Sequence, residues 1–303
     1  MRFKSLDLNL LVALDLLLAE RNVSRAAERL RITQSAMSNA LSRLRDYLGD
    51  ELLVQVGRRM ELTPRAELLK QPVRDILVRI ESSVTTIPRF DPNTSDRIFR
   101  IYVSDYSLAT LVPRFLEMIA PGNYPIRFEF RPQTSQPHQT LDSGEADLLI
   151  IPSEFASQEH PLEVIYDEGF VCIADRRHPR IGDNLDRKAF CRERHAVMRP
   201  SSDAVTFETK SMTRQGIVRD IDITTFSFAS LPYLVAGTQR LATVHTRLGR
   251  QAALHLPLKV LKLPFKIPRM RQSVQWHTYR SNDPAILWLR TTLRTAAETM
   301  DHG

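Results

Sequence analysis

The 303-residue sequence predicts an α/β protein with an N-terminal winged helix-turn-helix, one long linker helix and a larger part of alternating strands and helices. Three observations support this fold class. Residues 23–48 have the apolar spacing of two short helices, residues 62–87 carry a longer helical stripe, and from residue 97 strands alternate with helices. We therefore divide the chain into residues 1–63, a linker helix and hinge at 64–96, and an α/β part at 97–303.

The composition is typical of a globular protein, with 43% hydrophobic and 25% charged residues. A net charge of +7 suits a polyanionic partner, although an ordinary basic protein can carry the same charge. The apolar run Leu10–Ala19 is interrupted by Asp15 and is too short for a membrane span, so we expect no membrane partner and a cytoplasmic location. Cys172 and Cys191 belong to no metal-binding motif, and we expect neither metal nor cofactor.

The predicted recognition helix, which begins at Gln34, has one apolar and one short polar face. The apolar face contains Ala36, Met37, Ala40, Leu41, Leu44 and Leu48. The polar face contains Gln34, Ser35, Ser38, Asn39, Ser42 and Arg45, with Arg43 at its edge. Gln and Asn can bond adenine bidentately in a major groove about 12 Å wide, and Ser can reach base or phosphate. This face indicates DNA reading, but its pattern alone equally fits an amphipathic helix pair in an all-α domain.

The neighbouring segments complete a helix-turn-helix. Leu6–Glu20 is a strongly apolar helix capped by Asp7, on which the pair can pack. Ser24–Leu30 is a second helix capped by Ser24, with small residues that permit a close crossing. We expect DNA contacts from Ser24, Arg25, Thr33, Gln34, Ser35, Ser38, Asn39, Ser42, Arg43, Arg45, Arg58 and Arg59.

A β-hairpin wing is predicted after the helix pair. Gly49 suits a helix C-cap. Residues 52–56 have the alternating pattern of a first strand, and Met60–Leu62 form the second, antiparallel strand. Arg58 and Arg59 lie in the turn, where they would contact phosphates or the adjacent minor groove. A solvated basic turn is the alternative.

Thr63 is predicted to cap a long helix that starts at Pro64 and runs to about Ile87, with a kink at Pro72. Its apolar residues follow heptad spacing, and they are Leu62, Ala66, Leu69, Val73, Ile76 and Ile80. We expect Leu69, Val73, Ile76 and Ile80 to form the contact of a homodimer or homotetramer. The alternative is a helix folded back on its own domain.

Strands and helices alternate after the polar segment Pro88–Asp96. Predicted strands are Phe99–Val103, Ile126–Arg131, Ala146–Ile151, Ala196–Met198 and Ile221–Thr225. Predicted helices are Tyr106–Ile119, Gln136–Ser143, Val205–Gln215 and Asp283–Met300. Further elements are Val164–Tyr166, Phe170–Ala174, Leu185–Phe190, Ser227–Ala236, Leu241–Val244, Thr246–Ala253, Leu258–Leu261 and Ser273–Thr278. This alternation predicts two open sheets.

The phrase VSRAAERLRITQSAMSNALSRLRDYLGDELLVQ, with the three-part order of the whole chain, resembles the LysR-type transcriptional regulators. Three segments are similar to the NodD and NahR branch of that family, namely MRFKSLDLNLLVALDLLLAERN, RLRDYLGDELL and QWHTYRSNDPAILWLR. Two departures stand out: Ala36 replaces a common proline, and Thr63–Ala66 replaces Thr-x-Ala-Gly. The second also occurs in the NodD-like branch, so it bears on linker geometry alone.

The resemblance implies a regulator that binds double-stranded promoter DNA, acts with RNA polymerase and responds to a small molecule. It also implies that the C-terminal part is similar to periplasmic solute-binding proteins, with an effector between two α/β lobes. The first lobe would comprise residues 97–167 and 267–303, and the second residues 168–266. The effector would shift the angle between DNA-binding dimers and so activate or repress a promoter.

Effector contacts are expected beyond the carboxyl ends of strands. Ser104, Asp105 and Tyr106 follow the first strand, although Ser104 could merely cap the next helix. Other candidates at such positions are Pro152, Arg199 and Ser202, with Arg199 either a carboxylate clamp or an exposed loop residue.

The resemblance places Phe226 and Trp276 in the pocket lining, and Phe228 lies close by. An aromatic wall of this kind suits an aromatic acid, a flavonoid or a phenol, whereas the alternative is that all three are core residues.

Two other functions were weighed. An enzyme with a helical appendage finds no support, because the sequence contains no GxSxG, phosphate loop, HExxH or dinucleotide glycine fingerprint. A solute-binding protein conflicts with the first ninety residues and with the lack of a signal peptide. We therefore expect a DNA-binding regulator rather than an enzyme.

Overall fold

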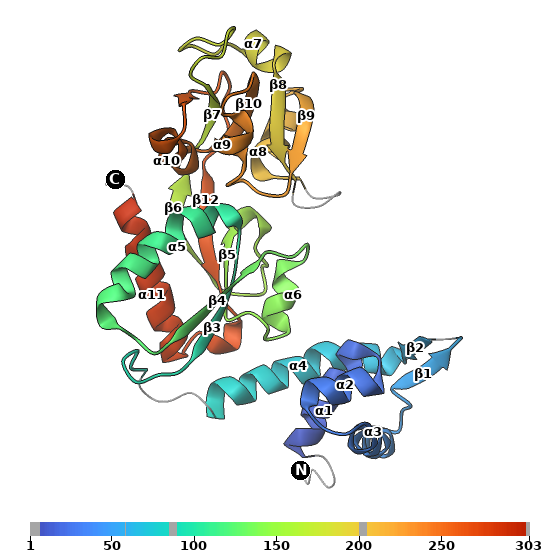
Figure 1. Cartoon of the computed structure of the whole chain (residues 1–303). Coiled ribbons are helices and arrows are strands. Elements are labelled where there is room, and N and C mark those ends of the chain that lie inside the picture. Colours follow the sequence, from blue (N-terminus) through green and yellow to red (C-terminus); the bar gives the residue numbers. More distant parts are fainter. Residues whose placement is uncertain (1–6, 58, 85–89, 200–204, 301–303) are drawn as a thin grey trace. The chain divides into compact units, whose positions relative to one another are not determined.

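The computed structural model describes residues 7–57, 59–84, 90–199 and 205–300, and is shown in Figure 1. It separates into two compact units, the first containing residues 1–87 and the second nearly all of the chain from Pro88 onward. No helix in the described part is long and apolar enough to cross a bilayer.

The first unit begins with α1 (Leu8–Glu20), α2 (Val23–Leu30) and α3 (Gln34–Leu48). The predicted cap of α1 is confirmed, since Asp7 Oδ1 accepts the Leu10 amide at 2.9 Å. The predicted cap of α2 is wrong. Asn22, in extended backbone, accepts the Arg25 amide at 3.0 Å, so α2 starts one residue early and Ser24 lies inside it.

The three helices share one apolar core. Leu14 and Leu17 of α1 and Ala26 of α2 pack with the buried face of α3. That face contains Met37, Leu41 and Leu44, as the helical periodicity predicts. Ala36 departs from the prediction and is exposed, because it belongs to the first turn of α3, where residues 34–36 are all exposed.

The predicted wing is present. Strands β1 (Leu53–Val56) and β2 (Arg59–Leu62) are antiparallel and joined at Gly57, whose φ of +62° favours glycine. Helix α4 (Pro64–Val84) follows and continues through Pro72, with Thr63 Oγ1 accepting the Ala66 amide at 3.0 Å. The cap predicted for Thr63 is thus confirmed.

Helix α4 uses the first half of its apolar stripe inside its own unit. Val73 is buried and Leu69 half-buried against the core that α1 contributes to, whereas Ile76 is 45% exposed. The predicted partner contact through Leu69 and Val73 therefore needs correction, because apolar spacing alone does not tell which helix covers a stripe.

The second unit contains two five-stranded sheets, which confirms the α/β class. The strands of the first sheet are β3 (Ile98–Val103), β4 (Arg127–Pro132), β5 (Leu148–Pro152), β6 (Leu162–Glu168) and β12 (Met270–Gln275). The strands of the second are β7 (Phe170–Asp175), β8 (Arg194–Met198), β9 (Asp220–Thr225), β10 (Arg240–His245) and β11 (Leu258–Leu261). We call the portions built on these sheets the first and second lobes.

Helices flank both sheets. They are α5 (Asp105–Ile119), α6 (Pro137–Asp142), α7 (Arg187–Arg192), α8 (Phe207–Arg214), α9 (Leu231–Val235), α10 (Thr246–His255) and α11 (Pro284–Thr299). In the first lobe, α5 and α11 lie on one side of the sheet and α6 on the other (Figure 1). Both sheets are mixed, since β12 runs antiparallel to β5 and β6, and β7 antiparallel to β10 and β11.

Two crossovers connect the lobes. The first passes through Gly169 between β6 and β7, and the second comprises residues 262–269 between β11 and β12. A Cβ atom at Gly169 would lie 2.9 Å from Thr246 Oγ1, so a larger residue here would force the Thr246 side chain to shift. Contacts between the lobes lie at or directly after the carboxyl ends of β3, β9 and β10.

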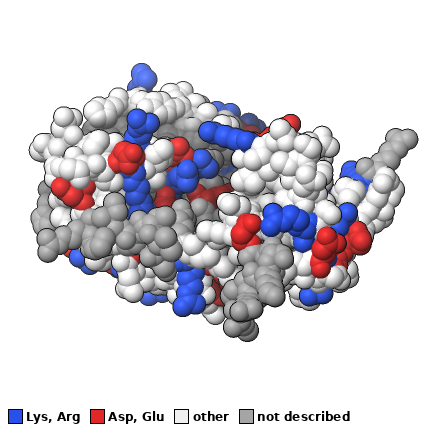
Figure 2. All heavy atoms as spheres, turned by 90° about the horizontal axis from the view of Figure 1, so that it is seen from below, with Lys and Arg blue, Asp and Glu red and all other residues white. Residues whose placement is uncertain are grey.

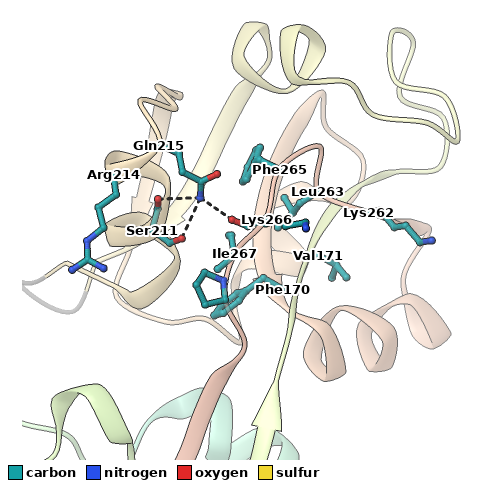
Figure 3. A pocket seen from close by; sticks show the side chains of 11 residues that line it. Phe170, Val171, Ser211, Arg214, Gln215, Lys262, Leu263, Phe265, Lys266 and Ile267 are labelled. Carbon is teal, nitrogen blue, oxygen red and sulfur yellow. Dashed lines mark hydrogen bonds between the residues drawn. The ribbon is translucent and has the colours of Figure 1, made fainter.

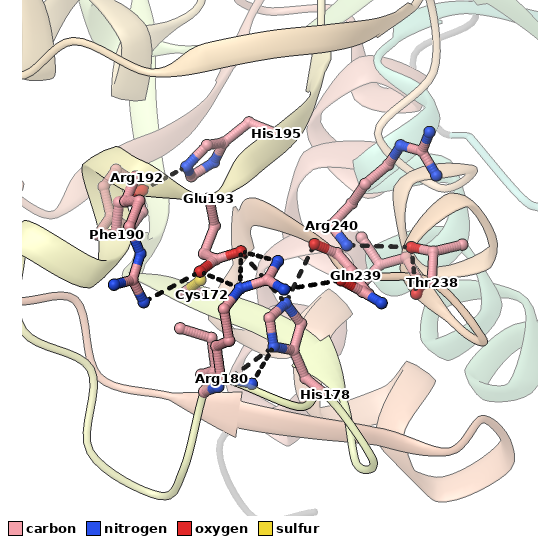
Figure 4. A network of polar contacts seen from close by, with 12 residues as sticks. Cys172, His178, Arg180, Phe190, Arg192, Glu193, His195, Thr238, Gln239 and Arg240 are labelled. Atoms are coloured by element: carbon pink, nitrogen blue, oxygen red, sulfur yellow. Dashed lines mark hydrogen bonds and ion pairs between the residues drawn. The ribbon is translucent and has the colours of Figure 1, made fainter.

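A polar network holds the long segment after β7 in the second lobe (Figure 4). Glu193 is 2% exposed, and Arg180 donates to it from Nε at 2.9 Å and from Nη2 at 2.7 Å. These hydrogen bonds lower the pKa of Glu193. His178 Nε2 lies 3.0 Å from the Gln239 carbonyl and extends the network to the start of β10.

Candidate functional site

The polar face of α3 is open to solvent. Gln34, Ser38, Asn39 and Ser42 are exposed, and within the described residues their side chains make no hydrogen bond. Short side chains that already lack protein partners can bond bases without first breaking a protein contact.

Other predicted DNA contacts shape or flank this face. Thr33 caps α3 by accepting the Ala36 amide at 3.2 Å, and Ser35 Oγ lies 3.0 Å from Thr33 Oγ1. Ser24 and Arg25 are exposed on α2.

The two arginines of α3 are engaged by the protein. Arg45 donates from Nε to the Glu51 carbonyl at 2.8 Å and from Nη2 to the Leu53 carbonyl at 2.9 Å. It therefore fastens the base of the wing to α3, a positioning role that was not predicted from the sequence. Arg43 forms an exposed ion pair with Asp7 at 3.3 Å, which is weak enough to exchange for a phosphate.

At the wing, Arg59 is exposed in β2, while Arg58 lies outside the described residues. Figure 2 shows Lys and Arg side chains interspersed with Asp and Glu on one face, rather than merged into a single basic surface. The net charge of the chain thus does not by itself locate the DNA site.

The lobes are tied together at the start of α5. Asp105 Oδ2 accepts hydrogen bonds from Ser227 Oγ at 2.7 Å and from the Ala229 amide at 2.9 Å. Ser104 Oγ accepts the Ser107 amide at 3.3 Å, so its capping role, one of the two interpretations of the sequence, is confirmed. Asp105 is thus a lobe-to-lobe bridge, which the sequence pattern gave no means to find.

Tyr106 belongs to a second tie and is 1% exposed. Its ring stacks on His245 at 3.7 Å, and its hydroxyl donates to Glu168 Oε2. Arg247 Nη1 of α10 donates to the same carboxylate oxygen at 2.9 Å. Burial raises the pKa of Tyr106 well above its usual value. As placed, Tyr106 links α5, the first crossover and α10, instead of lining an open site.

Sequence reasoning missed Glu168 and Arg247. The acidic residue directly before Gly169 was a possible signal, but its partners come from α5 and α10, far away in the chain. Two buried polar atoms in the same region, His245 Nδ1 and Gln272 Oε1, have no hydrogen-bond partner in the described part of the chain. Gln272 Nε2 donates to Ser107 Oγ at 3.1 Å, so these atoms adjoin consecutive residues of α5.

The remaining effector candidates differ in placement. Arg199 and Phe226 are exposed after β8 and β9, with Phe226 at 83%. Phe228 packs edge-on against His245 at 4.7 Å. Pro152 is half-buried at the end of β5, opposite Gln272. Ser202 lies outside the described residues.

Trp276 is a core residue, which corrects its assignment to the pocket lining. It is 5% exposed, its Nε1 donates to Ser281 Oγ at 3.1 Å, and the Arg290 guanidinium lies 3.3 Å from its ring centroid. It follows Gln275 at the end of β12, whereas Met270 at the other end pairs with Glu168 beside the crossover. The first lobe therefore holds it away from the lobe junction.

A separate pocket of about 690 Å³ lies in the second lobe (Figure 3). Its walls come from the start of β7, the end of α8 and residues 262–268. None of the predicted effector residues that the structure describes lines it. Among the described residues, no group of His, Cys, Asp and Glu is arranged to hold a metal ion.

Family comparisons agree with this architecture. The model described as "Bacterial regulatory helix-turn-helix protein, lysR family" matches residues 8–67, and that described as "LysR substrate binding domain" matches residues 93–298. Nodulation protein D 3 of Mesorhizobium japonicum is 36% identical over 301 residues, covering 99% of this chain and 100% of that protein. Nodulation protein D 1 of the same organism is 37% identical, covering 99% and 96%.

Solved structures show the same fold. A probable transcriptional regulator from Pseudomonas aeruginosa is 28% identical with a TM-score of 0.65, covering 96% of this chain and 97% of that one. Full-length OxyR of Pseudomonas aeruginosa reaches a TM-score of 0.71 at 16% identity, covering 97% and 95%, a likeness of fold alone. The chain belongs to the LysR family of transcriptional regulators, with a DNA-binding helix-turn-helix and an effector-binding domain, and is not an enzyme.

Proposed function

We propose that the polar face of α3 reads the operator and that a small aromatic effector binds where the carboxyl strand ends of the two lobes meet. The first part is supported by Gln34, Ser38 and Asn39, which are exposed and unbonded within the described residues. Exposed Arg25 and Arg59 would contact phosphates and make the affinity depend on salt.

One observation carries the effector part: His245 Nδ1 and Gln272 Oε1 are buried without partners beside the start of α5. A buried polar atom without a hydrogen bond costs about 1–3 kcal/mol, which a ligand hydroxyl could recover. Phe228 contacts the His245 ring, Phe226 offers an exposed aromatic face, and exposed Arg199 offers a carboxylate partner. This chemistry fits an aromatic acid, a flavonoid or a phenol.

The same position explains how an effector would act. Asp105 joins α5 of the first lobe to Ser227 and Ala229 of the second, so a ligand beside it changes the relative free energy of lobe arrangements. The regulator then acts on RNA polymerase at a promoter, in the cytoplasm where that DNA lies.

The regulator assembles as a homodimer or homotetramer through α4. Ile76 and Ile80 remain from the predicted contact, and Leu68, 78% exposed, replaces Leu69 and Val73, which pack within their own unit. The exposed apolar residues lie beside the buried stripe, which is where a second α4 would pack.

A thermal-shift screen of the full chain tests the effector proposal. Aromatic acids, flavonoids and phenols are compared, and a ligand at 100 times its dissociation constant adds about 2.7 kcal/mol of stability. Phe226→Ala should reduce the shift, while Tyr279→Ala, another exposed aromatic truncation, should leave it unchanged. Failure of every aromatic class to shift the wild type would contradict the effector proposal and leave family membership untouched.

A further inference from the structure

The pocket in the second lobe, here called the α8 pocket, is built from three segments. Phe170 and Val171 begin β7 directly after the first crossover, and Ser211, Arg214 and Gln215 come from the end of α8. Residues 262–268 of the second crossover form the remaining wall. Figure 3 shows Phe265, Leu263 and Ile267 gathered near the middle, with Arg214 and Lys262 extending at opposite sides.

Hydrogen bonds and ring contacts fix the walls. Gln215 Nε2 donates to the Lys266 carbonyl at 2.7 Å and to the Ser211 carbonyl at 3.3 Å, which joins α8 to the second crossover. Phe265 packs edge-on against Phe190 at 5.0 Å, and Phe170 stacks on Phe207 at 5.8 Å. The apolar walls are thus held in place without a ligand, which lowers the entropy cost of binding one.

The charge of the lining has one sign. Arg214, Lys262 and Lys266 are its charged residues, and no acidic side chain lines the pocket. None of the three forms an ion pair within the part of the chain that the structure describes. Cations at the edge of an apolar surface attract a ligand that has an apolar body and an anionic end.

We propose that the α8 pocket binds an amphipathic organic anion, an aromatic ring system carrying a carboxylate or sulfonate. Its volume of about 690 Å³ lies within the range of about 300–1,000 Å³ usual for small-molecule sites. The ring system lies against Phe170 and Phe265, and the anionic group meets Lys262, Lys266 or Arg214. This site is separate from the strand-end effector position, since Ser104, Arg199 and Phe226 do not line it.

Titration of the full chain with 1-anilinonaphthalene-8-sulfonate, followed by its fluorescence, tests the proposal. We expect saturable binding that weakens as salt increases, and displacement by 2-naphthoate but not by its neutral amide at equal concentration. The double variant Lys262→Glu/Lys266→Glu should weaken binding at least tenfold. Lys188→Glu makes the charge change of one of these two substitutions at an exposed position of α7 and should alter binding less than twofold.

A second variant tests the pocket without changing its charge. Ser211→Trp should fill the space and abolish displaceable binding, while a cooperative thermal unfolding transition followed by far-UV circular dichroism reports that the chain remains folded. Wild-type affinity in the lysine double variant or in folded Ser211→Trp would overturn the proposal, as would equal displacement by the acid and its amide. Phe226→Ala should not affect this binding, which separates the site from the effector position.

Discussion

Arg45 belongs to α3 and acts as a positioning residue for the wing. Its guanidinium donates to the carbonyls of Glu51 and Leu53, which begin the wing. A charged donor to two backbone carbonyls orients the hairpin with respect to α3, although the side chain is about one third exposed and solvent screens part of the gain.

We predict that Arg45→Ala loosens the wing by about 1 kcal/mol, because hydrogen bonds from a partly exposed cation contribute little more. Hydrogen–deuterium exchange of residues 53–62 should then be about fivefold faster. Arg43→Ala removes the exposed ion pair with Asp7 and should leave exchange in the wing unchanged. Equal effects of the two substitutions would argue against the positioning role.

Two buried histidines predict a pH dependence of the second unit. Burial lowers the pKa of His245 to about 3 and that of His195 to about 4. Both histidines stay neutral in the folded state, whereas in the unfolded chain they take up protons near pH 6.5. The free energy of unfolding therefore has its full value above pH 6.5 and decreases as the pH falls toward 4. At pH 5.5 each histidine should lower the free energy of unfolding by about 1.4 kcal/mol relative to its value at high pH.

This pH dependence can be followed by tryptophan fluorescence, since Trp276 and Trp288 both lie in the second unit. The free energy of unfolding in urea should be lower at pH 5.5 than at pH 7.5. In His245→Gln this difference should be smaller than in the wild type by about 1.4 kcal/mol. The exposed His138→Gln is the control. An unchanged difference in His245→Gln would show that this histidine does not titrate as proposed.

At the scale of elements, α1 and α4 are joined by an ion pair in the core of the first unit. Arg74 Nη1 lies 2.7 Å from Asp15 Oδ2, and Asp15 is 7% exposed. Burial raises the pKa of Asp15, and the charge of Arg74 opposes that shift. The pair fixes how α4 lies against α1 beyond what the apolar stripe of Ala66 and Val73 provides.

We predict that Arg74→Leu destabilises the first unit by about 3 kcal/mol, since it leaves a carboxylate buried without its partner. The double variant Asp15→Leu/Arg74→Leu should recover most of that loss, because two apolar residues replace the pair. Exchange of the slowest amides in residues 8–20 measures both. A double variant as unstable as Arg74→Leu would contradict the argument.

Periodicity predicted elements better than it predicted partners. The strand at Leu258–Leu261 and the buried face of Met37, Leu41 and Leu44 follow directly from residue spacing, because local pattern determines them. Leu69, Val73 and Trp276 were misplaced, since burial against another element depends on tertiary contacts that spacing does not encode. The Asp105 bridge joins residues more than 120 positions apart and has no local signature.

At the scale of the whole molecule, the chain combines a DNA-binding helix-turn-helix with a two-lobed domain whose lobes are tied through Asp105 and Glu168. Each unit has its own core, so effector chemistry and DNA chemistry are built from different residues. If the proposed function is correct, substitutions in α3 should change operator choice and preserve ligand binding, and the reverse should hold for Phe226.

The most direct test of this account is selection of preferred sequences from random double-stranded DNA by the wild type, Gln34→Ala and Arg59→Ala. Gln34→Ala should lose preference at particular base pairs, by about 1–3 kcal/mol, because a base contact is removed. Arg59→Ala should bind all sequences more weakly with the same preference, since it removes a phosphate contact. If Gln34→Ala selects the wild-type sequence with wild-type affinity, α3 does not read the operator through this face.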